Sequence, residues 1–343
     1  MDRVGSFAGR AALEALAATR AHVLLRPLRR VTGVIFKVER VCPRRPGRFV
    51  PNRCREMTPE FLEALVVELR RRKIEIVSLD EMHRRLMEPD RKAKRFACIT
   101  CDGGYVDHHA FVHPIFRKHD APFAIFIPTA FPDRIGELWW LMLEAVIGKT
   151  DRLALLIDGR EQRIDCRTAS EKARLFEALW SWLMARPTNE EISRYLDDLA
   201  ARYGVDVKAI CADVCMSWTQ IAALAADPLV TVGAQSVNHP ILAKLPEAKV
   251  RFEMTMSQSV IESAVGVRPR YFAYPFGRKG EAGPREFEIA GALGFRAALT
   301  TRPGAVRARH SAHMMALPRM SLASDFQHLR YVPMLMSGVS VSR

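Results

Sequence analysis

Apolar and polar positions along the chain predict strands that alternate with helices. Val31 to Val41 is dominated by apolar, β-branched residues, which predicts a first strand. Thr58-Pro59 opens a segment whose apolar residues recur at helical spacing to about Lys73, which predicts a helix. The succession continues with predicted strands at 75–79, 96–100 and 123–128 and predicted helices at 80–86 and 108–119. This alternation is typical of a parallel α/β sheet.

The alternation is interrupted between about residues 136 and 217. This stretch is mostly helical in its pattern, carries four tryptophans and contains one predicted strand pair around residues 153–164. Strands are predicted again at 230–232, 271–274, 296–300 and 315–322. We therefore predict one α/β domain over residues 31–335 with a mainly helical insertion at about 136–217, followed by a tail at 336–343.

Residues 1–30 predict a separate N-terminal element. Apolar residues alternate there with arginines, which indicates a basic amphipathic helix. Such a helix either lies on an anionic membrane surface or covers a hydrophobic face of a neighbouring element.

Composition narrows the class of protein. The chain has 343 residues, 49% of them hydrophobic, and no apolar run approaches the ~20 residues needed to span a bilayer. Glu14, Arg20 and Arg26 interrupt the apolar core that a secretory signal requires. Seven cysteines at irregular spacing form no disulfide framework. We expect a cytoplasmic protein, either free or peripheral to the inner membrane, without a signal peptide or transmembrane helix.

The formal net charge of +14 raises the question of polyanionic partners. Nucleic acid, anionic lipid and acidic polysaccharide are all compatible with this charge. The arginines are scattered, however, and no helix-turn-helix, zinc-finger or RNA-binding pattern accompanies them. We expect no nucleic-acid partner.

Two short segments carry the chemistry. Residues 99–105 read Ile-Thr-Cys-Asp-Gly-Gly-Tyr, and residues 233–240 read Gly-Ala-Gln-Ser-Val-Asn-His-Pro. They resemble the two metal-site motifs of the NodB-homology polysaccharide deacetylases, T-F-D-D-G-Y and G-x-H-[ST]-x-x-H-P. Family-like segments also stand in family order at 38–41, 126–129, 216–218 and 271–277. The resemblance spans roughly residues 31–331.

The resemblance implies a distorted (β/α) barrel with its site at the carboxyl ends of the strands. The implied activity is removal of an acetyl group from an N-acetylated amino sugar, in a glycan or a lipid-linked precursor. The implied cofactor is a divalent metal such as zinc. Asp102 matches the general base and His239 matches the second metal-binding His. Gly103 and Gln235 stand where the family has its metal-binding Asp and its first metal-binding His.

These two replacements predict that metal binding is impaired. A catalytic zinc normally has three protein ligands, and the matched positions retain one. Glu39, which stands where relatives often have His, offers an alternative. Asp102, Glu39 and His239 would together rebuild a ligand set, or else Glu39 pairs with a nearby arginine.

Three aromatic residues are candidates for substrate binding: Tyr105, Tyr274 and Phe276. Stacking against a sugar ring is one role for the last two, and packing of one of them in the core is equally compatible with the sequence. The general-acid His of the family has no unique counterpart among His310, His313 and His328. His109 and His113 share a helix face at metal-like spacing, but exposed histidines explain that spacing too.

Three functional hypotheses follow. The first is a degenerate deacetylase-like protein that binds carbohydrate or acts as a scaffold. The second is an active deacetylase with a rebuilt metal site. The third, which ranks last, is a metal-free hydrolase that uses Asp102 or the adjacent Cys101.

Overall fold

The computed structural model describes residues 31–90, 92–157, 160–322 and 327–337. The predicted helix over residues 1–30 lies outside the described residues, as does the tail from residue 338. None of the helices in the described ranges has the length and apolar character needed to cross a membrane.

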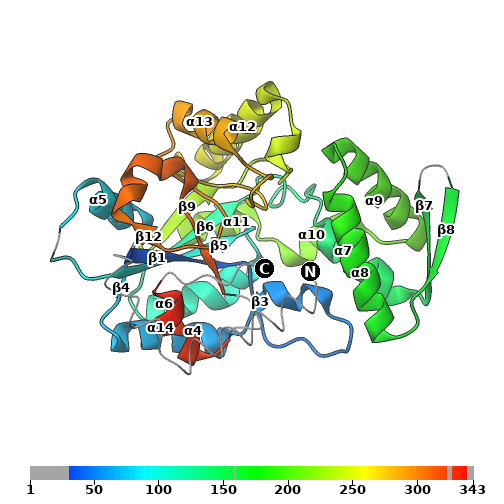
Figure 1. Cartoon of the computed structure of the whole chain (residues 1–343), viewed down its shortest axis with the longest axis horizontal. Helices are drawn as coiled ribbons and strands as arrows, with labels where there is room; N and C mark the ends of the chain where they lie inside the picture. The colour runs from blue at the N-terminus through cyan, green and yellow to red at the C-terminus, as the bar shows by residue number, and fades with distance from the viewer. Residues whose placement is uncertain (1–30, 91, 158–159, 323–326, 338–343) are drawn as a thin grey trace.

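A curled sheet forms the centre of the molecule (Figure 1). Its main path runs β11-β10-β9-β6-β5-β1-β12, with β4 beside β5 and β13 beside β1. All pairs are parallel except β1 with β12. The bounds are β1 Val31–Val38, β4 Glu75–Ile76, β5 Phe96–Asp102, β6 Phe123–Ile127, β9 Val230–Ala234, β10 Tyr271–Ala273, β11 Ala297–Leu299, β12 Val306–Arg307 and β13 Met320–Ser321. The predicted parallel α/β architecture is confirmed.

Helices cover both faces of this sheet. In Figure 1, α4, α6 and α14 lie below it, and α12 and α13 lie above it. The helical elements outside the insertion are η1 Pro51–Arg55, α4 Pro59–Arg71, α5 Leu79–Met87, η2 His108–Val112, α6 His113–Lys118, α11 Trp218–Ala225, η3 Leu242–Lys244, α12 Glu247–Val265, α13 Pro284–Ala292, η4 Ala308–Ala316, η6 Leu329–Tyr331 and α14 Val332–Leu335. The strands β2 Arg40–Val41 and β3 Glu56–Met57 form a separate small pair. Thr58 caps α4 by accepting a hydrogen bond from the Phe61 amide, as the sequence predicts.

The predicted insertion stands at the right of Figure 1. It contains α7 Trp139–Lys149, the hairpin β7 Arg152–Ile157 with β8 Arg160–Asp165, α8 Ala169–Met184, α9 Asn189–Tyr203 and α10 Val207–Val214. Its buried residues form a hydrophobic cluster of their own, which Tyr105, Phe131 and Ile241 of the sheet domain join. The insertion therefore packs against the loops that follow β5, β6 and β9.

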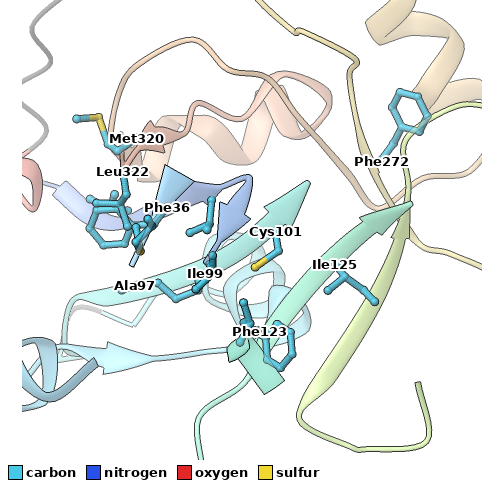
Figure 2. Close-up of a cluster of buried hydrophobic side chains, with 14 of the residues drawn as sticks. Phe36, Ala97, Ile99, Cys101, Phe123, Ile125, Phe272, Met320 and Leu322 are labelled. Atoms are coloured by element: carbon cyan, nitrogen blue, oxygen red, sulfur yellow. The ribbon is translucent and has the colours of Figure 1, made fainter. Parts of the chain in front are cut away.

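Alternate residues of β5 enter different clusters. Ala97, Ile99 and Cys101 point into the cluster drawn in Figure 2, and Phe96 and Cys98 enter the cluster on the other face. A strand buried on both faces is typical of a parallel sheet covered by helices. Asp102 is the last residue of this buried strand, so the fold places its carboxylate at the carboxyl edge of the sheet.

The predicted strand over 315–322 is mostly wrong. Only Met320–Ser321 pairs as a strand, and residues 308–316 form a short helix instead. Pro318 cannot donate a backbone hydrogen bond, which shortens the pairing. The residue after that proline, Arg319, has a fully buried side chain.

Candidate functional site

Asp102 forms a buried ion pair with Arg319. The guanidinium donates from both terminal nitrogens to the two carboxylate oxygens at 2.6 and 2.7 Å. Arg319 also donates to the Thr300 carbonyl at 2.9 Å and to the Thr100 hydroxyl at 3.1 Å. This two-pronged geometry is the strong form of the Arg–carboxylate contact, and it fixes the orientation of Asp102.

Gly103 and Gln235, which the motif resemblance aligns with metal ligands, contact each other. The Gly103 amide donates to the Gln235 side-chain oxygen at 3.0 Å and to the Phe126 carbonyl at 2.9 Å. Gly103 has φ +94°, and a Cβ there would lie 2.6 Å from Cε2 of Tyr105. Gln235 is buried beside it. Glycine is thus required by both conformation and space at the position of the family's metal-binding Asp.

The loop after β9 is held in a strained conformation. Ser236 and His239 have φ of +65° and +56°, which non-glycine residues rarely adopt. The buried carboxylate of Glu253 on α12 accepts from the amides of Val237 at 2.7 Å and Asn238 at 3.0 Å, and from the Asn238 side chain at 2.8 Å. Strain of this kind concentrates at functional sites and persists because surrounding contacts over-determine it.

The imidazole of His239 lies among aromatic rings. Its centroid is 4.9 Å from Phe276, 5.4 Å from Trp140 and 5.9 Å from Phe131. Burial lowers the pKa of His239 to about 4, although the charges of Asp102 and Glu39 act to raise it. The ring is therefore neutral at pH 7, and its buried Nδ1 has no hydrogen-bond partner.

Glu39 pairs with two cations. Its carboxylate accepts from Lys37 and, at 2.7 Å, from Arg55. Burial by itself would raise the pKa of Glu39, but the charges of Arg55 and Lys37 hold it well below its ordinary value. The Arg55 guanidinium in turn stands 4.7 Å from the ring of Trp180. These contacts match the alternative in which Glu39 pairs with a neighbouring arginine.

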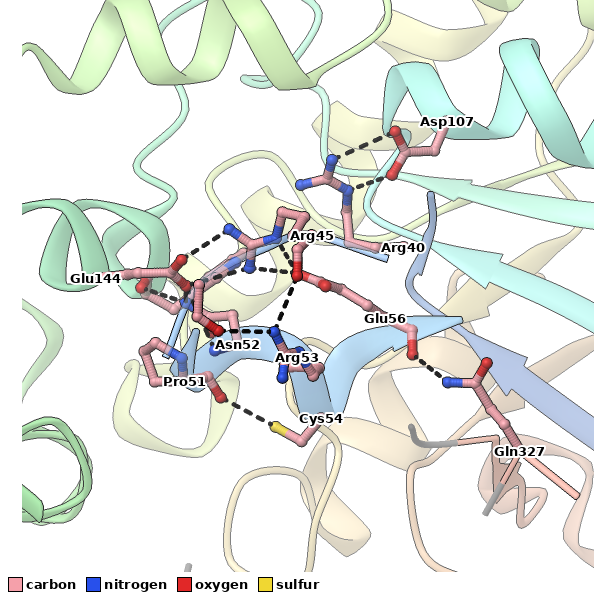
Figure 3. Close-up of polar contacts among 12 residues, drawn as sticks. Arg40, Arg45, Pro51, Asn52, Arg53, Cys54, Glu56, Asp107, Glu144 and Gln327 are labelled. Atoms are coloured by element: carbon pink, nitrogen blue, oxygen red, sulfur yellow. Dashed lines mark hydrogen bonds and ion pairs between the residues drawn. The ribbon is translucent and has the colours of Figure 1, made fainter. Parts of the chain in front are cut away.

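A polar network ties the segment that carries Arg55 to the insertion (Figure 3). Arg45 pairs with Glu56 and, at 2.7 Å, with Glu144 of α7. The Asn52 side chain donates to Glu144 at 2.8 Å and to the Trp140 carbonyl at 2.8 Å. Arg55 and the tryptophans of α7 are therefore held as one wall beside His239.

His108 is a second buried histidine of the site. Its Nε2 donates to the Glu39 carbonyl at 2.7 Å, because a carbonyl oxygen can only accept. Nδ1 is then the unprotonated nitrogen, and it has no partner. Burial lowers the pKa of His108. The residue lies in the π-helical turn η2, a distortion that is frequent at functional sites.

The donor groups do not fit a zinc ion. Both oxygens of Asp102 are bound by Arg319, and Glu39 is bound by Lys37 and Arg55. The side-chain oxygen of Gln235 already accepts a hydrogen bond from the Gly103 amide, and glutamine is a weaker zinc ligand than His or Cys. Within the described ranges, no three His, Cys, Asp or Glu side chains gather as a metal site. The rebuilt set of Asp102, Glu39 and His239 stays a prediction.

The three aromatic candidates lie in different surroundings. Tyr274 is fully buried, and its hydroxyl donates to the Met315 carbonyl at 2.9 Å. Of its two predicted roles, Tyr274 therefore has the one of packing in the core. Tyr105 is buried under the guanidinium of Arg40, 4.9 Å from its ring centroid. Phe276 is partly exposed and faces His239, with φ +58°. Of the three, Phe276 is the only one whose side chain is not buried.

The remaining candidates lie apart from this geometry. Cys101 is fully buried in the core, and burial raises the pKa of its thiol, which disfavours a nucleophilic role. His113 pairs with Asp227 at 2.8 Å. His310 accepts the Arg307 amide proton at 3.0 Å. In the described part of the chain, no hydrogen bond or ring contact links His310, His313 or His328 to Asp102 or His239.

Sequence reasoning missed Arg319. A signal for it was present, since an arginine stands between apolar residues in Ala316-Leu317-Pro318-Arg319-Met320. A fully buried arginine almost always has a partner of opposite charge. Which acid it meets depends on tertiary packing, because Arg319 precedes β13, β13 pairs with β1, and β1 pairs with β5, the strand that ends at Asp102.

Comparison with known sequences finds a similarity to one family over part of the chain. The model of the family described as polysaccharide deacetylase matches residues 182–298. The matched segment contains Gln235 and His239 but ends short of the segment with Arg319 and begins after Asp102. No curated protein matches the chain in sequence.

Solved structures of deacetylases share the fold. The deacetylase PplD of Streptococcus pyogenes is 14% identical with a TM-score of 0.55, over 84% of this chain and 92% of its own. IcaB of Ammonifex degensii is 16% identical with a TM-score of 0.53, over 87% of this chain and 94% of its own. The deacetylase domain of BpsB from Bordetella bronchiseptica is 14% identical with a TM-score of 0.51, over 85% of this chain and 96% of its own. The predicted resemblance and the predicted barrel-type fold are confirmed.

Proposed function

We propose that this protein binds N-acetylated amino-sugar glycans through the inherited site and has lost the metal chemistry of its family. The observation that carries the proposal is the contact between Gln235 and Gly103. The side chain at the position of the first metal-binding His accepts a hydrogen bond from the backbone at the position of the metal-binding Asp. Gly103 and Gln235 therefore satisfy each other's buried polar groups by a direct hydrogen bond.

The aromatic wall supports a carbohydrate ligand. Phe276 and Trp180 are partly exposed and stand beside His239 and Arg55, and aromatic rings offer flat apolar faces to the C–H face of a sugar. Neutral His239 supplies a ring nitrogen without a positive charge, which suits a neutral acetamido group.

Binding and turnover are measured together to test this proposal. N-acetylglucosamine oligomers are titrated into the full chain by calorimetry, and released acetate is measured in parallel with zinc or cobalt present. We expect binding without acetate release, and weaker binding by the Phe276→Ala variant. Acetate release that Asp102→Asn abolishes would instead identify a working deacetylase, and the absence of any binding would remove the glycan from the proposal.

One observation favours the alternative of a rebuilt metal site. A metal-binding imidazole must be neutral, and His239 is neutral at pH 7 with a free Nδ1. An active enzyme of this kind would need Asp102 or Glu39 to leave its arginine partner. Zinc binding that depends on His239 separates this alternative from the main proposal.

A further inference from the structure

The amino ends of the parallel strands gather at one end of the sheet, opposite the insertion (Figure 1). The helical elements α5 and η4 close this end, since both contribute to the hydrophobic cluster inside the curled sheet, through Leu79, Met82, Leu86 and Met314. Asp102 lies at the other end, at the carboxyl edge. We call the surface formed by α5, η4 and the residues that lead into β5, β10 and β11 the amino-end face.

Exposed basic side chains are spread over the amino-end face. They come from the segments before three different strands and from η4: Lys92 and Lys94 before β5, Arg268 and Arg270 before β10, Arg296 before β11, and Arg309 in η4. Because these elements meet at one end of the sheet, cations that are far apart in the sequence share one surface.

Carboxylates neutralise only part of this charge. Asp80 of α5 is shared by two arginines, Arg270 at 2.6 Å and Arg296 at 3.3 Å. In the described part of the chain, neither Lys92 nor Arg309 forms an ion pair. The amino-end face therefore keeps an excess of positive charge.

The insertion has the opposite charge. Residues 136–217 contain 14 acidic and 11 basic side chains, so the whole positive excess of the chain lies outside the insertion. In Figure 1, the insertion stands at the right and α5 at the left. An anionic surface would therefore attract the amino-end face and repel the insertion, which gives the molecule a preferred orientation.

Two apolar side chains stand exposed among these cations. Val267, beside Arg268, is 62% exposed, and Met87 of α5 is 54% exposed. Basic groups next to exposed apolar groups suit an anionic bilayer, because the headgroups attract the charges and the acyl boundary accepts the apolar groups. A nucleic-acid backbone offers no such boundary, and its partners usually gather cations in a stripe or on one helix.

We infer that the amino-end face docks on an anionic lipid bilayer and leaves the candidate site turned toward the solution. The inference goes beyond the proposed function and does not depend on it, since it uses none of the residues around His239. The chain enters β1 at Val31, at this same end. The segment before Val31 is the one whose sequence predicts a basic amphipathic helix, which places a second membrane-compatible element next to the face in the sequence.

Vesicle binding tests the inference on the full chain. Co-sedimentation is measured with vesicles of phosphatidylcholine alone and of phosphatidylcholine mixed with phosphatidylserine. We expect binding only to the anionic vesicles, with an affinity that falls as salt is added. The double variant Lys92→Gln with Arg309→Gln should bind about 25-fold more weakly, from a loss of roughly fivefold for each cation. Circular dichroism verifies that each variant is folded.

Matched variants separate the face from the overall charge. Arg167→Gln with Lys208→Gln removes two exposed cations from the insertion and should bind as the wild type does. Met87→Ser should weaken vesicle binding by about three- to tenfold. Ile135→Ser, which changes a similarly exposed residue outside the amino-end face, should leave it unchanged.

Four results would overturn the inference. The first is no binding to anionic vesicles, and the second is binding that survives loss of Lys92 and Arg309. The third is an equal loss in both double variants, which would show that net charge alone drives binding. The fourth is tighter binding to a double-stranded oligonucleotide than to the vesicles, with Met87→Ser neutral, which would identify a nucleic-acid surface instead.

Discussion

The side-chain oxygen of Gln235 lies 3.0 Å from the amide nitrogen of Gly103 and accepts its hydrogen bond. By the motif resemblance, both residues stand where the deacetylases place metal ligands, and neither offers the donor that zinc would use. Their contact joins the loops after β5 and β9 directly. It also means that restoring one ligand alone breaks a buried hydrogen bond.

Replacing Gly103 should destabilise the protein through both conformation and crowding. Gly103→Ala forces a side chain into φ +94° and places a Cβ 2.6 Å from the Tyr105 ring. We expect a loss of about 2–4 kcal/mol in the free energy of unfolding, measured by urea denaturation. Gly280 is the matched control, because it has the same φ of +94° with no atom within 4 Å. Gly280→Ala should lose only about 1–2 kcal/mol, and equal losses would show that crowding at Gly103 is unimportant.

Breaking the buried ion pair should cost more than breaking a surface pair. Arg319→Met leaves the Asp102 carboxylate buried without its partner, which typically costs about 3–5 kcal/mol. Arg270→Met removes one arginine from the half-exposed Asp80 and should cost under about 1 kcal/mol. Chemical denaturation of both variants gives the comparison.

A double substitution isolates the coupling of that pair. Asp102→Asn together with Arg319→Met should lose less stability than the sum of the two single variants, since neither charge is then left unpaired. Additive losses would contradict a direct ion pair between Asp102 and Arg319.

His239 should make stability depend on pH in a defined window. Its pKa is about 4 in the folded protein against an ordinary value of 6.5, so the unfolded state binds the proton more readily. The contribution of His239 is fully present above pH 6.5 and falls as the pH drops toward 4, by about 3 kcal/mol at most. The free energy of unfolding is measured across this range for the wild type and for His239→Asn, because Asn tolerates the positive φ at this position. The same slope in both proteins would show that His239 is not buried in its neutral form.

Glu253 should hold the His239 loop through its negative charge. Glu253→Gln replaces one acceptor oxygen with a donor that faces the amides of Val237 and Asn238. We expect a loss of about 1–3 kcal/mol in stability and weaker glycan binding, because a buried hydrogen bond is left unmade. Glu262→Gln changes an exposed residue on the same helix and should be close to neutral. Unchanged glycan binding in a destabilised Glu253→Gln protein would show that the loop is dispensable for the ligand.

Much of the fold follows from local sequence patterns. The strand that ends at Asp102 and the helix capped by Thr58 are visible as a buried apolar run and as a cap followed by proline. Helix and strand boundaries near the C-terminus do not follow from such patterns. Residues 315–322 have an apolar pattern, but Pro318 limits the strand pairing to Met320–Ser321.

The sequence nominates the candidate site but does not predict its contacts. The motifs nominate Asp102, Gly103, Gln235 and His239 by resemblance, and the structure shows how these residues are held. The two hydrogen bonds from Arg319 to Asp102 depend on tertiary packing between segments more than 200 residues apart, which residue spacing does not encode. Tyr274 is buried and Phe276 is partly exposed, although the two residues stand in one short motif. This difference also depends on tertiary packing, which the motif does not reveal.

Zinc titration into the purified full chain tests the loss of metal chemistry most directly. Calorimetry is carried out with zinc and with cobalt, with His239→Ala as the control and with folding verified by circular dichroism. The geometry of Asp102, Gly103 and Gln235 predicts no binding that differs between the wild type and His239→Ala. Micromolar or tighter binding that His239→Ala abolishes would contradict this account and would establish a rebuilt metal site.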